Sequence, residues 1–245
     1  MKITFLGTSH GVPAADRYCS ATLIEINGSH YLIDAGAPAA DLLLRRGVNL
    51  DTLKGVFTTH LHGDHAFGVI QLASLCSWFF KTTDLDIYLT EQRGIDVVSE
   101  LISAFDGKLE DRVRLKLMTE ETVWQDENLR ITPLPTQHLA GANRPAYSYL
   151  VEAEGKKILF SGDLSYHLAK EDFPAYALQN EVDLMICEMA HFGPEHLGPY
   201  LEKCRAKELL FNHVFPLHKL EAIAELDMKY GYPIHAVEDG EEIEL

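Results

Sequence analysis

Short runs of β-forming residues, alternating or continuously apolar, fill the first third of the chain and are bounded by glycine, asparagine or aspartate. Such runs predict strands. The four clearest are KITFLG (2–7), ATLIEIN (21–27), HYLIDAG (30–36) and KGVFTTH (54–60). An Asn-Gly pair separates the second run from the third, and this pair is the strongest short signal for a β-hairpin in the chain.

Three longer segments have apolar residues at helical spacing and predict helices. Pro38 opens the first and Gly47 closes it, which is the usual asymmetry of helix ends. Trp78, Phe79 and Phe80 lie near the end of the second, and such aromatic side chains usually pack in the core. The three segments are PAADLLLRRG (38–47), DHAFGVIQLASLCSWFFK (64–81) and EQRGIDVVSELISAF (91–105).

The second half of the chain repeats this alternation of strands and helices. Strands are predicted for LRITPLPTQH (129–138), AYSYLVEAEGKKILFSGD (146–163, with a turn inside) and VDLMICEM (182–189). Helices are predicted for HLGPYLEKCRA (196–206) and FPLHKLEAIAELDMKYG (215–231). Many half-apolar strands in two mixed halves predict an α/β fold of four layers, an αββα sandwich with two mixed β-sheets flanked by helices. No linker or repeat interrupts the pattern, so we expect a single domain over 1–245.

The composition and net charge of the chain exclude some classes of binding partner. Hydrophobic residues make up 47% and charged residues 24% of the 245 residues, enough for a continuous core. The formal net charge of −16 argues against long nucleic acids as partners. No apolar run is long enough to span a membrane, and the first residues lack the pattern of a signal peptide. The four cysteines are scattered without metal or disulfide spacing, so we expect a cytoplasmic protein.

The segment HLHGDH gathers three histidines and an aspartate, His60, His62, Asp64 and His65, at a predicted junction of strand and helix. In an extended strand end, residues two apart share a face, so His60 and His62 can reach one point. Gly63 lets the chain turn, and Asp64 and His65 can then face a second point. Imidazole and carboxylate groups are common metal ligands, and a solvated loop would not gather four of them. The segment therefore predicts metal binding.

This segment matches the H-x-H-x-D-H signature of the metallo-β-lactamase fold hydrolases, and the chain resembles that family over nearly its whole length. Four further positions match in order: Asp34 in YLIDAG, His138 in PTQH, Asp163 in LFSGD and His213 in LLFNH. The resemblance implies the fold named above. It also implies two divalent metal ions, zinc by default, with manganese or iron as alternatives.

By this resemblance His60, His62 and His138 hold one metal ion, Asp64, His65 and His213 hold the other, and Asp163 bridges both. Asp64 also counts among the catalytic residues. Open coordination positions mark a catalytic site, in which a hydroxide bridging the metals attacks the substrate. Asp34 is expected to orient a ligand histidine and not to bind metal itself.

The segment CEMAHFGPEH resembles the ribonuclease Z and small-molecule phosphodiesterase branch, which places an extra histidine here. His191 is therefore the expected general acid, and Glu188 is expected to hold its ring. His10 and His167 are candidates for substrate binding. The long glycine- and proline-rich arm with which ribonuclease Z grips tRNA is not visible between His138 and Asp163, so precursor tRNA is not the expected substrate.

We therefore predict a hydrolase of a small phosphodiester, either a cyclic nucleotide or a cyclic phosphate. This substrate is a small anion, and the resemblance further implies a homodimer. The alternative is an acyl hydrolase, a lactonase or thioesterase, because the same nucleophile can attack a carbonyl carbon. A third hypothesis is a non-catalytic module that binds metal.

Overall fold

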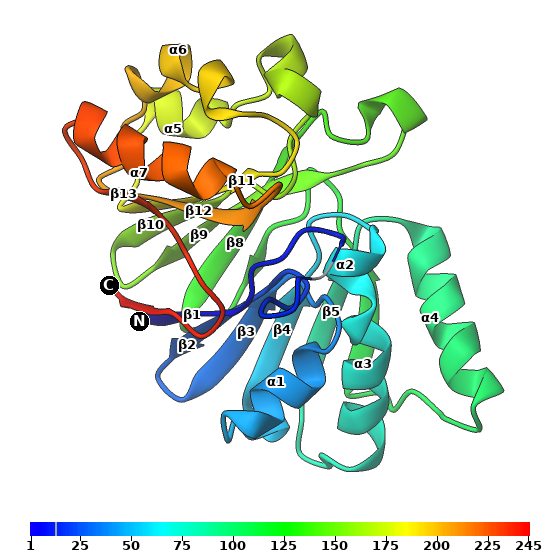
Figure 1. Ribbon diagram of the computed structural model, residues 1–245. Helices are drawn as coiled ribbons and strands as arrows, with labels where there is room; N and C mark the ends of the chain where they lie inside the picture. Colours follow the sequence, from blue (N-terminus) through cyan, green and yellow to red (C-terminus); the bar gives the residue numbers. More distant parts are fainter. Residues whose placement is uncertain (13) are drawn as a thin grey trace. The chain divides into compact units, whose positions relative to one another are not determined.

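The computed structural model describes residues 1–12 and 14–245 and divides the chain into two compact units. The first unit contains residues 1–118 and 239–245, and the second contains residues 119–238. Each unit is built around one seven-stranded mixed sheet (Figure 1). The prediction of a single domain stays a prediction.

The sheet of the first unit has the strand order β14-β1-β2-β3-β4-β5-β6. Strands β14, β1, β2 and β3 pair antiparallel, with Asn27 and Gly28 at the turn of the β2–β3 hairpin, and β3 to β6 run parallel. Met1 and Leu245 lie close together because the last strand pairs with the first. The bounds are β1 Lys2–Gly7, β2 Ala21–Ile26, β3 Ser29–Ile33, β4 Leu53–Phe57, β5 Leu85–Leu89, β6 Val113–Leu117 and β14 Glu242–Glu244.

Helices α1 and α3 lie along one face of this sheet (Figure 1) and bury their apolar sides in a shared core with the strands. Gly68 begins α3 at a close approach, since a Cβ there would stand 2.7 Å from the carbonyl oxygen of Ala35. The parallel strands need such crossover helices because a parallel pair cannot be joined by a tight turn. The bounds are α1 Ala39–Arg45, η1 Leu50–Thr52, α2 Gly63–Ala66, α3 Gly68–Trp78 and α4 Gln92–Ala104.

The sheet of the second unit has the order β13-β12-β11-β10-β9-β8-β7. Strands β7 to β10 pair antiparallel, and β10 to β13 run parallel. Helices α5, α6 and α7 follow the parallel strands and contribute to a second apolar core (Figure 1). The strands are β7 Trp124–Gln125, β8 Leu129–Pro135, β9 Tyr147–Ala153, β10 Lys156–Phe160, β11 Leu184–Met189, β12 Leu209–Val214 and β13 Ile234–Ala236. The helices are η2 Ala140–Ala142, η3 Tyr166–Glu171, α5 Ala175–Gln179, η4 Pro194–His196, α6 Gly198–Leu201 and α7 Lys219–Lys229.

The predicted class, two mixed β-sheets flanked by helices, is confirmed, and three details are corrected. The helix predicted over 196–206 is reduced to α6, four residues long, with proline at its start. Strands β5 and β6 were not predicted, because their short runs are interrupted by charges. Of the aromatic side chains near the end of α3, Phe80 packs against the core as predicted, but Trp78 and Phe79 do not, since they are 50% and 72% exposed. Among the described residues, no helix combines the length and apolar character needed to cross a bilayer.

Candidate metal centre

In the first unit, the loop after β4 and the helix α2 bring three imidazoles together. The ring of His60 lies 4.5 Å from that of His62 and 4.2 Å from that of His65, measured between centroids. Nε2 of His65 is 3.5 Å from Oδ2 of Asp64. The helix α2 starts at Gly63, which turns the chain between the pair His60 and His62 and the pair Asp64 and His65. His60 and His65 are buried, and His62 and Asp64 are partly exposed.

Asp34 orients two of these histidines through hydrogen bonds. Its carboxylate, 4% exposed, accepts a hydrogen bond of 2.7 Å from Nδ1 of His65. It also accepts the backbone N–H of Thr59 at 2.7 Å and the Thr59 hydroxyl at 3.0 Å. Oγ1 of Thr59 in turn lies 3.1 Å from Nδ1 of His60. Because Nδ1 of both rings is held by the protein, Nε2 is the nitrogen that each ring can offer to a metal ion.

The loop after β1 reaches Asp64. A Cβ built on Gly11 would stand 3.2 Å from Oδ2 of Asp64, so the backbone passes next to this carboxylate. His10 is partly buried in the same loop, and its Nδ1 accepts the backbone N–H of Val12 at 3.3 Å. The proposed contact of His10 with substrate stays a prediction.

In the second unit, a buried carboxylate gathers three histidines. Oδ2 of Asp163 is 3.7 Å from Nε2 of His138 and 3.6 Å from Nε2 of His213. It is also 3.8 Å from Nδ1 of His191. These distances exceed direct hydrogen bonds and leave space for a cation among an oxygen and two ring nitrogens. His138 and His213 are thus brought to Asp163 by loops and strands far apart in the sequence.

Backbone and side-chain hydrogen bonds fix this arrangement. Nδ1 of His138 lies 3.1 Å from the carbonyl oxygen of Leu164, which again directs Nε2 inward. The hydroxyl of Thr136 donates to the carbonyl oxygen of Asp163 at 3.0 Å. The carboxylate of Asp172 accepts the backbone N–H groups of Gln137 and Ser165 at 2.9 and 2.7 Å, so it ties the two loops together. Burial raises the pKa of Asp172.

Glu188 and His191 form a buried pair at the end of β11. Nδ1 of His191 lies 2.9 Å from Oε1 of Glu188. The same carboxylate accepts the backbone N–H groups of Leu164, Ala190 and His191, which anchors it firmly. A carboxylate can only accept here, so Nδ1 of His191 carries the proton and Nε2 is the atom that can exchange a proton with substrate.

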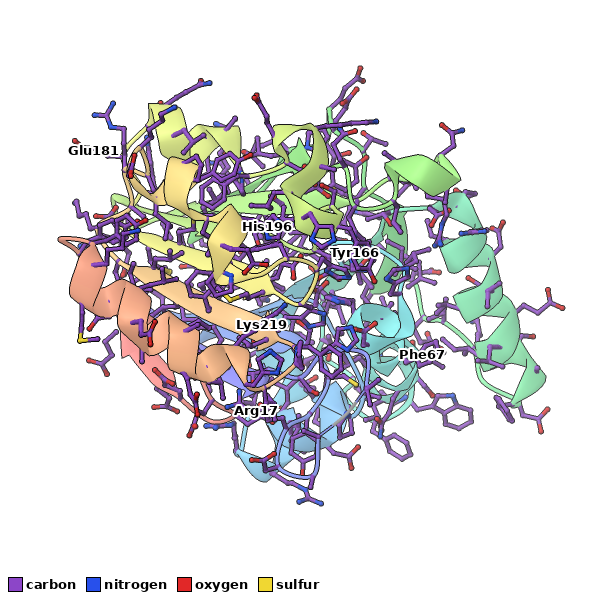
Figure 2. All side chains as sticks on the ribbon, turned by 45° about the horizontal axis from the view of Figure 1, so that its top comes forward. Arg17, Phe67, Tyr166, Glu181, His196 and Lys219 are labelled. Atoms are coloured by element: carbon purple, nitrogen blue, oxygen red, sulfur yellow. The ribbon has the colours of Figure 1, made fainter. Side chains whose placement is uncertain are left out.

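An open pocket of about 510 Å³ lies beside His191 within the second unit. Tyr166 and His167 line it, and the backbone N–H of His167 donates to the carbonyl oxygen of His191 at 3.0 Å. The Tyr166 ring, 70% exposed, lies 5.1 Å from the His191 ring and nearly perpendicular to it. His196 approaches His167 to 4.8 Å between ring centroids; Tyr166 and His196 are both labelled in Figure 2.

The sequence interpretation missed Thr59, Thr136 and Asp172, which act through the predicted ligands. Thr59 could have been found, because it directly precedes His60 and lies at the end of a predicted strand. Asp172 could not, because only folding brings it to residues 137 and 165. The predicted metal ligands therefore form two sets, one in each unit, and their union in one dinuclear centre stays a prediction. Both sets consist of ligands suited to divalent metal ions.

The chain has the metallo-β-lactamase fold. The metallo-β-lactamase fold protein YhfI from Bacillus subtilis matches it with a TM-score of 0.78, covering 99% of this chain and 98% of that one at 20% identity. The short form of human tRNase Z matches with a TM-score of 0.75, covering 100% and 99% at 21% identity. The chain belongs to the family described as anti-Pycsar protein Apyc1, whose model matches residues 1–213.

A curated relative extends this result. Ribonuclease Z of Pseudomonas putida (strain GB-1) is 37% identical over 140 residues, which are 56% of this chain and 44% of the relative. The chain thus spans less than half the length of this relative. The predicted resemblance to the ribonuclease Z branch is confirmed.

Proposed function

We propose that the chain is a dinuclear-metal-dependent hydrolase of small phosphodiesters, with cyclic nucleotides and cyclic phosphates as the substrate class. One observation carries this proposal: the buried Glu188–His191 pair stands next to Asp163 and is linked to it through Leu164. A metal centre by itself does not define which bond is hydrolysed, because many classes of hydrolase use one. A histidine held by a carboxylate beside that centre serves a reaction whose leaving oxygen needs a proton.

The proposed ligands are His60, His62 and His138 for one ion, Asp64, His65 and His213 for the other, and Asp163 for both. Three of the histidines have Nδ1 held by an acceptor within their own unit, which supports binding through Nε2. Zinc suits this mixture of imidazole and carboxylate, and manganese or iron would also be accepted. When bound, the two ions would supply Lewis acidity and lower the pKa of coordinated water.

The chain itself contributes the proton and the orientation. His191 donates a proton from Nε2 to the leaving oxygen, and Glu188 stabilises the charged form of the ring before the transfer. Asp34 and Thr59 hold His60 and His65 at fixed ring angles. The pocket beside His191 gives the leaving portion of a small substrate a place in the second unit.

A small substrate is supported by two features. Between His138 and Asp163 the chain forms only η2 and the β9–β10 hairpin, which leaves no long arm at the position implied for ribonuclease Z. The net charge of −16 disfavours a long polyanion, whereas a small anion needs only a local positive centre. The cytoplasmic location stays a prediction. The homodimer stays a prediction.

His191→Ala tests the proposal in protein reconstituted with zinc or manganese. We expect hydrolysis of a 3′,5′-cyclic nucleotide to fall by about 10²- to 10⁴-fold, because its alkoxide leaving group needs a proton. Bis-p-nitrophenyl phosphate should be affected less, since p-nitrophenolate leaves unprotonated. Lactone or thioester turnover that exceeds phosphodiester turnover in the unsubstituted protein would instead establish the acyl hydrolase. Bound metal without turnover of any of these substrates would favour the non-catalytic module.

A further inference from the structure

We infer that Lys219 is a positioning residue for His191, acting through the backbone of the turn that carries this histidine. The inference rests on the proposed function, because it concerns the proton donor of that reaction. Lys219 begins α7 and is labelled in Figure 2.

The ammonium group of Lys219 donates hydrogen bonds to three backbone carbonyl oxygens. Nζ donates to the carbonyl oxygens of Met189, Ala190 and Phe192 at 2.9, 3.2 and 2.6 Å. These three residues surround His191 in the sequence. An ammonium group has three protons and no acceptor, so this turn satisfies all of its donors at once.

This position is unfavourable for a lysine on local grounds. The first turn of a helix carries the positive end of the helix dipole, where a cation is disfavoured. Partial burial adds a desolvation cost, and burial lowers the pKa of Lys219. The charged lysine is stabilised here by its three hydrogen bonds to carbonyl oxygens and by the nearby carboxylates of Glu188 and Glu195.

Glu188 binds the same turn through its backbone N–H groups, whereas Lys219 binds its carbonyl groups. Its carboxylate accepts the backbone N–H groups of Ala190 and His191, while Lys219 takes the carbonyl groups of Met189, Ala190 and Phe192. Both the donors and the acceptors of the turn are thereby fixed by charged groups. With its backbone fixed and Nδ1 bound to Glu188, the His191 ring retains one orientation, which aims Nε2 at a fixed point.

Lys219→Met tests the inference, because methionine keeps the length of the side chain and removes the three donors. Lys229→Met is the matched control: Lys229 is an exposed lysine at the other end of α7, next to the ring of Tyr230. A misplaced proton donor should matter only where the leaving group needs a proton. We therefore expect Lys219→Met to lower kcat on a 3′,5′-cyclic nucleotide by about tenfold or more, and kcat on bis-p-nitrophenyl phosphate by less than about threefold. Lys229→Met should change neither.

Equal losses on the two substrates, or no loss on either, would overturn the inference, because a general structural defect does not distinguish leaving groups. Should Lys219→Met fail to fold, Lys219→Arg replaces it. A planar guanidinium keeps the charge but cannot converge three donors on these oxygens, so a smaller loss with the same substrate selectivity is expected. An unchanged ratio of the two rates in the arginine variant would contradict the role.

A second measurement separates this inference from the proposed function. The Nδ1 proton of His191, bonded to Glu188, should give an exchange-protected proton resonance in metal-free protein, assigned by its absence in His191→Ala. We expect Lys219→Met to broaden or abolish this resonance and Lys229→Met to retain it. If the unsubstituted protein hydrolyses no phosphodiester, the proposed function fails, yet the resonance still decides whether Lys219 positions the ring. Its persistence in Lys219→Met would refute the positioning role.

Discussion

At the residue scale, Asp34 shows how one carboxylate can set the geometry of two histidines. It binds His65 directly and reaches His60 through the hydroxyl of Thr59. Asp34 itself adopts a positive φ of 61°, a conformation that aspartate tolerates better than most residues. The backbone is bent there so that the carboxylate can turn back toward Thr59.

Asp34→Ala should therefore reduce both metal affinity and stability. Loss of a carboxylate that orients a ligand histidine lowers metal affinity by about 10- to 100-fold. The buried Thr59 N–H left without its acceptor should cost about 1 to 3 kcal/mol of unfolding free energy. Competition with a chromophoric chelator and urea denaturation of the metal-free protein measure the two effects. Asp41→Ala is the control: Asp41 is an exposed carboxylate in the first turn of α1 that accepts a hydrogen bond from the Gln71 amide, so its removal should leave metal affinity unchanged and lower stability by no more than about 1 kcal/mol.

The buried thiols offer a pH-dependent prediction at the same scale. Burial raises the pKa of Cys76 to about 12, and burial also raises the pKa of Cys187. Since the thiolate is the reactive form, native Cys76 and Cys187 should resist alkylation at pH 8 and still resist it at pH 10. Burial also raises the pKa of Cys19 and Cys204, but these two thiols are partly exposed and should be modified first. Peptide mass spectrometry after timed iodoacetamide labelling measures this order, which equal labelling of all four would contradict.

At the scale of elements, the site residues follow the carboxyl ends of neighbouring parallel strands. Asp34 follows β3 and His60 follows β4, its parallel neighbour. In the second sheet, Asp163 follows β10, while Glu188 and His213 lie near the ends of β11 and β12. Parallel strands present their carboxyl ends at one edge, so residues distant in sequence meet there without long loops.

Gly36 shows how closely these loops are packed. A Cβ on Gly36 would stand 2.1 Å from the carbonyl oxygen of Asp64 and 2.6 Å from Cβ of Cys19. Gly36→Ala must therefore move the backbone next to a proposed metal ligand, and we expect a loss of at least about 1 to 3 kcal/mol in unfolding free energy. Gly141→Ala is the control, since a Cβ there meets nothing within 4 Å. Urea denaturation compares the two variants, and equal stability would show that the loop yields without strain.

At the scale of the whole molecule, metal binding should link the two units, because the proposed ligands come from both. A metal ion that binds only the folded state stabilises it, by about 2.7 kcal/mol at a concentration one hundred times its Kd. Adding zinc to chelator-treated protein should slow backbone hydrogen exchange around residues 60–65 and around residues 163 and 213 alike. Protection confined to one unit would contradict a shared centre.

Much of the site could be predicted from sequence because its ligands occur in a dense local cluster and in short motifs at strand ends. The HLHGDH segment needs only local geometry to present its histidines, and the strand pattern around it is plain. Asp34 and His191 were found through the family resemblance, and the three-residue spacing of Glu188 and His191 then indicated their pairing. Thr136 and Asp172 escaped because their partners are close only after β8, β10 and η3 have folded together.

The sequence by itself indicated most of the elements, the types of candidate ligand and the chemistry they can support, since these depend on periodicity, side-chain groups and spacing along the chain. Tertiary structure alone decided which backbone groups hold those side chains. Lys219 is the clearest case: its sequence position indicates an ordinary surface lysine at the start of a helix. Only the fold brings three carbonyl oxygens from a turn some thirty residues away to its ammonium group. Hydrogen bonds of this kind depend on distances in space, which the order of residues does not contain.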